Sequence, residues 1–317
     1  MIGLIRQSKS PAPPEPPARG AAPSGRGRVL APLALFAIVL VVWDLANTQG
    51  WVSDLILPRP GAVAVAAYDL FSTGLVWEHL GTTLYETLAG FALAALLGIG
   101  SAVAAGSSPL LRKMIYPYAV TLQVLPMLSI VPILISAFGF GSTSKIVIAG
   151  LISFFPIFVN ALTGLLTPDP DAEELFRSLR VGKKRTFVHL LLPTAAPMIF
   201  AGLRIGLTLA LAGAVVAEVV SAQKGLGFLV QRYSSQLNQD DAFAVVVVLT
   251  AMGLLLYGAI GCADRTFVFW RHAGRLPSRT RSRGRRVRRR LSGDPAEHDA
   301  TRTAASARPA ASEERTP

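Results

Sequence analysis

Long apolar runs without charge alternate with short charged segments along most of this chain. No residue between Thr87 and Leu111 is charged, and the run from Met114 to Ser144 is uncharged as well. About 20 apolar residues are enough for a helix to cross the hydrocarbon core of a membrane. The pattern therefore predicts an all-α polytopic membrane protein with six transmembrane helices. We expect these helices at residues 29–46, about 87–107, 116–138, 146–167, 194–218 and 242–263.

Composition supports a membrane location and argues against catalysis. Of the 317 residues, 51% are apolar and only 16% are charged, and the mean hydropathy is +0.47, which is too apolar for an ordinary soluble domain. The single cysteine, Cys262, excludes an intramolecular disulfide and a cysteine-based metal site. No nucleophile adjoins a base, and no glycine loop has the spacing of a phosphate-binding loop. We expect no catalytic residue, no metal and no cofactor bound by this chain.

The two ends of the chain differ from the middle. Residues 1–28 are rich in Pro, Gly, Ala and Arg, and are expected to form a disordered cytoplasmic N-terminal arm. Segment 29–46 could be a signal peptide, but the further spans favour a retained first transmembrane helix. Residues 271–317 are expected to be a disordered Arg-rich cytoplasmic tail, which begins with ten arginines up to position 290. Such a run favours anionic lipid, whereas nucleic-acid binding would need an aromatic platform, and no aromatic follows Trp270.

The distribution of Lys and Arg predicts the orientation of the spans. The N-terminal arm, Arg112 with Lys113, the segment 169–193 and the tail all fall on one side of the predicted helices. Because cytoplasmic loops carry an excess of Lys and Arg, this side is expected to be cytoplasmic, and both termini with it.

The segment 169–193 is a charged island between two apolar runs. Asp169 or Asp171 suits the N-cap of a short helix that would run to about Gly182. Leu175, Phe176 and Leu179 would gather into one apolar ridge. A helix hung between two spans has no core of its own, so a partner protein is the expected recipient of this ridge.

The spacing of the island resembles the EAA loop of bacterial ABC-importer permeases. Glu174-Leu175-Phe176 stands for the Glu-Ala-Ala triplet, Arg180 for the following Gly, Leu190 for the Ile, and Leu192-Pro193 for the end of the motif. Both alanines and the Gly are replaced, and we expect the left-handed turn to move from Arg180 to Gly182. The stretches FAGLRIGLTLALAGAVVAEVV and QKGLGFLVQ add a resemblance to the nitrate/sulfonate/taurine-type branch, over roughly residues 28–270.

This resemblance implies the type I ABC importer permease fold, with an ABC transmembrane type-1 domain at 80–268 and a cytoplasmic coupling loop at 169–193. It implies cytoplasmic ABC ATPase subunits that hold ATP and Mg, an extracytoplasmic solute-binding protein, a second permease copy in a homodimer, and a bacterial inner membrane location. Membrane lipid is a further expected partner, and nucleic acid is not. The ATPase-coupling residues that the resemblance implies are Glu174, Leu175, Phe176, Ser178, Leu179, Arg180, Gly182 and Pro193.

Polar and helix-breaking residues within the spans are candidates for a translocation pathway. Prolines in a span are tolerable where the backbone faces protein or a water-filled cavity. The candidates are Gln123, Pro126, Ser129, Pro132, Asn160, Arg204 and Glu218. Arg204 could pair with Glu86, reach the interface, or attract an anionic substrate. Glu218 is expected at the outer interface, either solvated or lining a gate.

Two further segments are singled out by small residues. In the second helix Gly90, Ala94, Ala95 and Gly98 form a face suited to close helix packing. Between the last two helices, Gly225 and Gly227 are expected to break helix, and the segment 221–241 is too apolar for a freely solvated loop. It is expected to be re-entrant or interfacial, either beneath a partner or against lipid.

The expected function is that of a permease subunit of an ATP-driven importer, moving a small anionic solute of the sulfonate, taurine or nitrate kind. Related permeases handle nitrate, taurine, alkanesulfonates, cyanate and pyrimidine precursors of thiamine, so the solute stays open. The alternative is a secondary transporter or channel driven by an ion gradient, which would favour acidic or histidine relays and inverted repeats; the sequence has neither. A membrane anchor for other proteins would not account for the proline-rich third helix.

Overall fold

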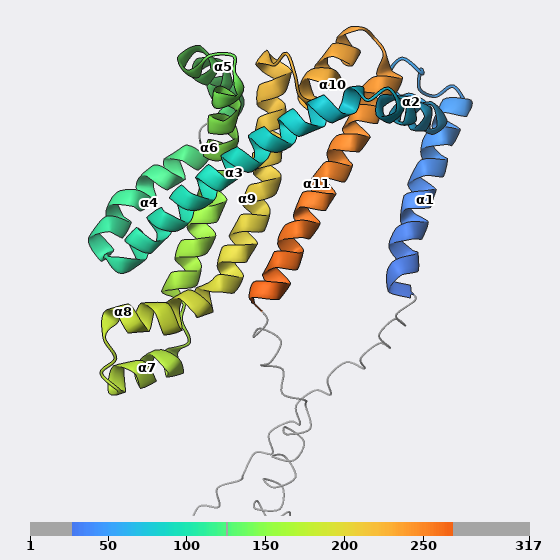
Figure 1. Cartoon of the computed structure of the whole chain (residues 1–317). Coiled ribbons are helices and arrows are strands. Elements are labelled where there is room, and N and C mark those ends of the chain that lie inside the picture. Colours follow the sequence, from blue (N-terminus) through green and yellow to red (C-terminus); the bar gives the residue numbers. More distant parts are fainter. Residues whose placement is uncertain (1–26, 125, 269–317) are drawn as a thin grey trace, which may run out of the picture. The chain divides into compact units, whose positions relative to one another are not determined.

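The structure is a computed structural model that describes residues 27–124 and 126–268. Every regular element within these residues is a helix, in the order α1 Gly27–Thr48, α2 Pro60–Ser72, α3 Leu75–Ser107, α4 Pro109–Val124, α5 Met127–Phe138, α6 Ser142–Leu166, α7 Pro170–Ser178, α8 Lys183–Thr186, α9 Leu192–Ser221, α10 Leu226–Ser235 and α11 Gln239–Phe267 (Figure 1). A π-helical turn, Phe187–Leu191, joins α8 to α9. The predicted tail 271–317 lies outside the described residues, as does the predicted arm up to residue 26, while Gly27 and Arg28 belong to α1.

The all-α membrane fold predicted from the sequence is confirmed. Within the described residues, five helical stretches are long and apolar enough to cross a membrane: Leu30–Thr48, Leu75–Ser107, Ser142–Leu166, Lys183–Ser221 and Gln239–Phe267. Each covers all or nearly all of one predicted span and extends beyond it at one end or both. The largest difference is in α3, which begins at Leu75 rather than near Thr87, because polar residues such as Glu78 continue the helix past the apolar run.

The remaining predicted span, 116–138, is divided into α4 and α5. Pro126 stands at the N-cap of α5 with extended backbone angles, φ −71° and ψ 92°. Proline has no N–H for the helical ladder, and its ring collides with the preceding turn. Pro117 and Pro132 lie inside α4 and α5. The sequence predicted a kinked helix here, and the structure has a break at Pro126 instead.

By their internal contacts the residues form two compact units. Among the described residues, one contains 27–90, 126–149 and 210–254, and the other contains 91–124, 150–209 and 255–268. Four boundaries fall inside α3, α6, α9 and α11, and one falls between α4 and α5. We call these the first and the second unit.

Glycines let the helices of the second unit approach closely. A Cβ added to Gly98 of α3 would lie 3.1 Å from Cγ2 of Ile157, and one added to Gly206 of α9 would lie 2.5 Å from Cγ1 of the same side chain. Ala94 is buried as well. Small residues are the usual means of close helix packing in membranes. The predicted small-residue face of α3 is thus confirmed at Ala94 and Gly98, and its partner is α6.

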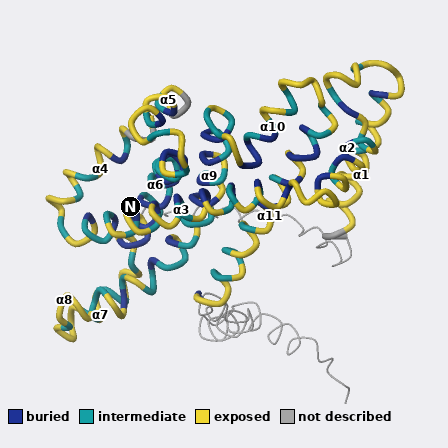
Figure 2. Tube along the Cα trace, turned by 45° about the horizontal axis from the view of Figure 1, so that its top comes forward, coloured by how far each residue is buried: buried dark blue, intermediate teal, exposed yellow. Residues whose placement is uncertain are grey.

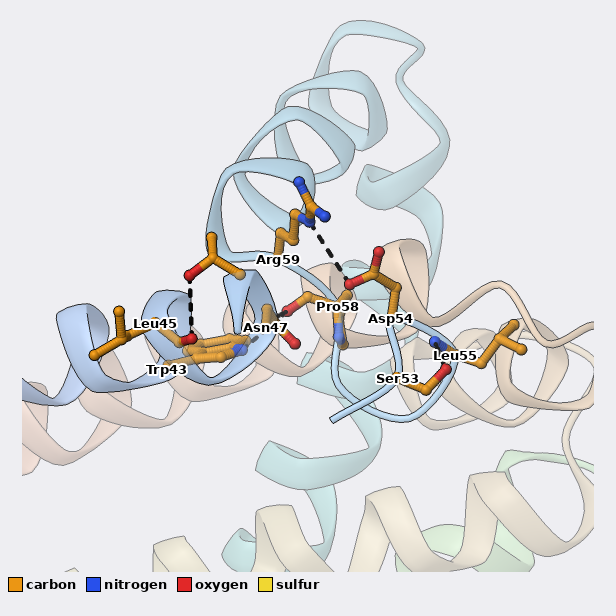
Figure 3. A network of polar contacts seen from close by, with 9 residues as sticks. Trp43, Leu45, Asn47, Ser53, Asp54, Leu55, Pro58 and Arg59 are labelled. Carbon is orange, nitrogen blue, oxygen red and sulfur yellow. Dashed lines mark hydrogen bonds and ion pairs between the residues drawn. The ribbon is translucent and has the colours of Figure 1, made fainter. Parts of the chain in front are cut away.

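In the first unit, polar contacts hold the connection between α1 and α2. Trp43 Nε1 donates a hydrogen bond to the carbonyl oxygen of Pro58 at 2.9 Å, and Asn47 Nδ2 donates to the same oxygen at 3.2 Å (Figure 3). Arg59 pairs with Asp54 at 3.6 Å. Because Pro58 lies just before α2, these two hydrogen bonds hold the start of α2 to the end of α1.

Candidate functional site

The predicted helix of the charged island exists as α7. The backbone N–H of Asp171 donates to Oδ1 of Asp169 at 3.0 Å, so Asp169 is the N-cap, and Pro170 takes the first helical position. Asp171 and Glu173 lie in the first turn, where carboxylates stabilise the positive end of the helix. The capping prediction for Asp169 is confirmed.

The end of α7 differs from the prediction. The N–H of Val181 donates to the carbonyl of Phe176 at 3.1 Å, and the N–H of Arg180 donates to the carbonyl of Arg177 at 3.0 Å. These bonds define a Schellman motif, in which Arg180 takes the left-handed position with φ 49°. The expected move of the turn to Gly182 is therefore wrong. Gly182 has extended angles, φ −65° and ψ 148°, and caps α8.

The apolar ridge predicted on α7 is divided between two faces. Leu175 and Leu179 are exposed, at 56% and 66% of their full accessible surface. Phe176 is half-buried, and with Glu173 and Arg177 it lines a cavity on another face of the helix. Glu174 and Ser178 are exposed beside the leucines. The outward face of α7 thus presents Leu175 and Leu179 with polar neighbours.

The chain returns to the spans through α8 and the π-helical turn. The N–H of Leu192 donates to the carbonyl of Phe187, which closes this wider turn. Pro193 follows within the first turn of α9. A proline ring collides with the carbonyl four residues earlier in a regular helix, and the wider turn makes room for it. The Leu192-Pro193 end of the motif thus lies at the start of a long span.

Figure 1 shows α7 and α8 beside one another, where the chain leaves α6 and before it enters α9. Most of α7 and α8 is exposed (Figure 2), and α7 has no buried residue. Leu190, by contrast, is buried. The island is therefore a pair of short, solvent-exposed helices. The chain is anchored by Leu190 where it leaves the island for α9.

The structure distributes the pathway candidates over both units. Pro126, Ser129, Pro132 and Glu218 belong to the first unit, and Gln123, Asn160 and Arg204 to the second. Gln123 lies in α4, and its side chain is outside what the structure describes. Ser129 is exposed in α5. Asn160 Nδ2 donates to the carbonyl of Pro156, one turn earlier in α6, at 2.8 Å.

Arg204 has a partner that the sequence analysis missed. Its Nη2 lies 3.3 Å from Oδ2 of Asp264, and its Cζ lies 5.1 Å from the centre of the Tyr257 ring. Both partners are on α11 and belong to the second unit with Arg204. The prediction of structural pairing is met by Asp264 rather than by Glu86. Asp264 directly follows the last predicted helix and could have indicated this, since an arginine within a span needs a carboxylate nearby.

Glu218 is not solvated at the outer interface, as one reading of the sequence expected. It is 1% exposed. Its Oε1 accepts a hydrogen bond from Thr83 Oγ1, and its Oε2 accepts one from the N–H of Gly227, both at 2.7 Å. The carboxyl group therefore joins α3, α9 and the first turn of α10 within the first unit.

The same segment is attached to α3 by backbone groups. The N–H of Leu226 donates to Thr83 Oγ1 at 2.8 Å, and the N–H of Gly225 donates to Nδ1 of His79 at 3.0 Å. Gly225 has φ 116°, which suits glycine, and precedes α10. The prediction that Gly227 breaks a helix is wrong. It lies inside α10, where an added Cβ would be 2.6 Å from the carbonyl oxygen of Val215.

The apolar residues of this segment are buried within the chain itself. Leu226 and Leu229 have no accessible surface, and the ring of Phe228 stacks on His79 with centroids 6.0 Å apart. The prediction that the segment is not freely solvated is confirmed for residues 226–230, whereas most of the residues that follow are exposed. A partner or lipid was expected to cover the apolar residues. Instead, Leu226 and Leu229 are buried by packing inside the first unit.

Glu86 adds a second buried carboxyl group to this cluster. It is 1% exposed and lies beside Ser142, Lys145 and Glu218. Lys145 Nζ donates to the carbonyl oxygens of Phe140 and Gly141 at 2.9 and 3.1 Å. The buried cation near Glu86 offsets part of the cost of burying this carboxyl group. The sequence analysis missed this cluster.

The geometry agrees with the chain's similarity to known proteins. The model of the family described as binding-protein-dependent transport system inner membrane component matches residues 94–265. This chain belongs to that family. The permease is 32% identical over 245 residues to the formylaminopyrimidine transport permease ThiX of Halalkalibacterium halodurans, covering 77% of this chain and 97% of that protein.

Other relatives place the permease in one branch of the ABC importers. It is 30% identical over 251 residues to the putative aliphatic sulfonates transport permease SsuC of Escherichia coli, covering 79% of this chain and 95% of the relative. It is 30% identical over 248 residues to the taurine transport permease TauC of the same organism, covering 77% and 90%. The permease is thus an ABC importer subunit of the sulfonate/nitrate/taurine branch and not an enzyme.

Solved structures support the fold. A chain from the inward-facing MetNI methionine ABC transporter superposes with a TM-score of 0.55 at 18% identity, covering 61% of the permease and 96% of that chain. A chain of an amino acid ABC transporter with histidines gives 0.52 at 16% identity, covering 63% and 96%. The type I importer permease fold predicted from the island is confirmed, and the protein is a multi-pass protein of the bacterial inner membrane.

Proposed function

We propose that a cytoplasmic ABC ATPase docks on the outward face of α7 and drives this permease through it. The observation that carries the proposal is the exposure of Leu175 and Leu179 on a helix that has no buried residue. Two large apolar side chains on so small a helix favour a partner surface, since exposed apolar clusters rimmed by polar groups mark interaction sites. Glu174 and Ser178 supply the polar rim.

The ends of α7 support its role as a lever. Asp169 caps the start and the Schellman motif at Arg180 closes the end, so the helix can move as one body. Beyond it, α8 and the π-helical turn lead into α9 without an unstructured linker, and Gly182 and Pro193 sit at the two junctions. Closure of an ATPase dimer around ATP and Mg would displace α7 and, through these junctions, the spans attached to it.

The orientation follows from charge. We propose that α7 and both termini are cytoplasmic, because the segments rich in Lys and Arg fall on that side of the spans. The loop at α10 then faces outward, where an extracytoplasmic solute-binding protein would deliver the solute. A second copy of the permease would complete the transport pathway as a homodimer.

The proposed solute is a small anion of the sulfonate, taurine or nitrate kind, after the relatives named above and a nitrate import permease of Synechocystis that is 31% identical. Arg204 is held by Asp264 at 3.3 Å and by Tyr257, so it is not a free cation for substrate. We therefore place selectivity mainly in the binding protein. Identifying that protein's ligand would identify the solute.

The docking proposal is tested by uptake in cells that express the permease with its neighbouring ATPase and binding protein. Leu175→Glu with Leu179→Glu should abolish uptake and release the ATPase from purified complexes, because two carboxylates cannot be buried unpaired in an apolar groove. His189→Glu, a change at an exposed position of the π-helical turn outside α7, controls for the added charge. Retention of the ATPase by the double variant would contradict the proposal.

The same assay separates the ATP-driven importer from an ion-driven transporter. Uptake should be lost when the ATPase is omitted and should persist when a protonophore collapses the proton gradient while ATP is maintained. The opposite pattern would favour the secondary transporter.

A further inference from the structure

A cavity of about 770 Å³ lies behind α7, entirely within the second unit. Its apolar wall comes from α3, α6, α7 and the return to α9, and consists of Val103, Leu165, Phe176, Val181, Phe187 and Leu191. Cavities of about 300–1,000 Å³ with apolar walls and a few polar groups are typical ligand sites. Leu175 and Leu179, the exposed leucines of α7, do not line this cavity. The cavity is therefore separate from the proposed ATPase-docking face.

The polar rim of the cavity is cationic. Arg177, Lys183 and Lys184 line it, together with one carboxylate, Glu173. Arg177 and Glu173 neutralise each other in an ion pair of 3.1 Å. Neither lysine has an ion-pair partner in the described part of the chain. An apolar pocket with two unpaired ammonium groups at its rim suits a ligand with an apolar tail and an anionic head.

The cavity also lies at the level of the membrane surface. Val103, Gly106 and Ser107 are in the last turns of α3, and Leu165 is next to the last residue of α6. Both helices are long and apolar enough to span a membrane, so these ends lie close to the boundary between hydrocarbon and water. Acyl chains and lipid headgroups meet at this depth.

A second cavity near the end of α6 repeats the same chemistry. It measures about 480 Å³, and its rim carries Arg112 and Lys113 above apolar residues that include Val159 and Leu162. Basic pockets between spans on the cytoplasmic side are a recognised setting for anionic lipid headgroups. Two such cavities on one side of the same unit favour lipid over a soluble metabolite.

We infer that the cavity behind α7 is a binding site for an anionic phospholipid of the cytoplasmic leaflet. Lys183 and Lys184 bind the headgroup phosphate, and the acyl chain lies against Val103, Phe176 and Phe187. The lipid would brace the inner face of α7 against α3 while the outer face stays free. Since the two faces are distinct, lipid binding can be tested independently of the ATPase.

The experiment uses the full chain in nanodiscs of mixed phosphatidylglycerol and phosphatidylcholine, with retained lipid counted by native mass spectrometry. The native chain should retain phosphatidylglycerol in preference to phosphatidylcholine. Lys184→Gln should lower this retention by about fivefold, the factor that corresponds to one lipid-facing charge. Arg185→Gln is the matched control, because it removes one charge from the next residue, which does not line the cavity.

A second pair of variants tests the cavity without changing charge. Gly106→Leu should reduce retention by filling the space, since an added Cβ at Gly106 already meets Leu165 at 3.5 Å. Gly100→Leu adds the same side chain to α3 where nothing lies within 4 Å, and it should leave retention unchanged. Equal loss with Arg185→Gln, equal retention of both lipids, or no effect of Gly106→Leu would each overturn the inference.

Discussion

At the scale of single residues, the most informative position is Arg180. The family's loop has glycine here, and the structure keeps the left-handed backbone, φ 49°, with an arginine in place. A side chain with a Cβ makes this conformation costly. The conformation persists because the two bonds of the Schellman motif and the shared cavity wall of Phe176 and Val181 determine it. The residue therefore carries strain that the island's geometry imposes.

Replacing Arg180 with glycine should stabilise the end of α7 by about 1 kcal/mol, because glycine adopts positive φ without a Cβ penalty. Hydrogen exchange of the Val181 amide, which donates to Phe176, measures this, and its protection should increase by about fivefold. Arg185→Gly is the control, since Arg185 lies in α8 and not in the left-handed region. Unchanged protection in Arg180→Gly would show that the turn is not strained.

At the scale of elements, close packing by glycine decides which helices pair. Gly206 of α9 approaches Ile157 of α6, and Gly202 approaches Asn160 and the carbonyl of Pro156. These contacts bring the backbones of α6 and α9 together in the second unit, on either side of the loop that carries α7. The proposed mechanism requires α6 and α9 to move together when α7 is displaced. Their close packing meets this requirement.

Gly206→Ala should destabilise the permease by about 1–3 kcal/mol, the usual cost of overpacking, because its Cβ would lie 2.5 Å from Ile157. Gly100→Ala adds the same methyl group to open space in α3 and should be neutral or slightly stabilising. Thermal unfolding in detergent compares the two. If Gly206→Ala melts at the same temperature as Gly100→Ala, the close approach of α6 and α9 is not as described.

At the scale of the whole molecule, one long helix stands between the charged island and α10 along the chain. The chain runs through α9, 30 residues long, between these two places. At about 1.5 Å per residue such a helix exceeds the hydrocarbon thickness of a bilayer, about 30 Å. The island and α10 are therefore expected on opposite sides of the membrane.

Cysteine labelling tests this arrangement in a Cys262→Ser background, since Cys262 is the only cysteine. A membrane-impermeant thiol reagent should label Gln236→Cys, just after α10, in intact spheroplasts. It should label Ser178→Cys, at the end of α7, only after the membrane is opened. Labelling of both positions from the outside would reject the proposed orientation.

The sequence by itself determined the all-α class, the location of the spans, the family and the cap of α7. These depend on local properties, since hydrophobic run length, capping chemistry and motif spacing are all read along the chain. The difference at residues 116–138 also has a local cause. The sequence shows the prolines there, and they break the helix at Pro126 where only a kink was predicted.

Only the tertiary structure decided which distant residues meet. It paired Arg204 with Asp264, joined His79, Thr83 and Glu218 to the start of α10, and turned Phe176 away from Leu175 and Leu179. Such contacts join positions up to 146 residues apart. Their partners are fixed by helix packing and by the need to satisfy buried polar groups, and neither is encoded in the spacing of neighbours along the chain.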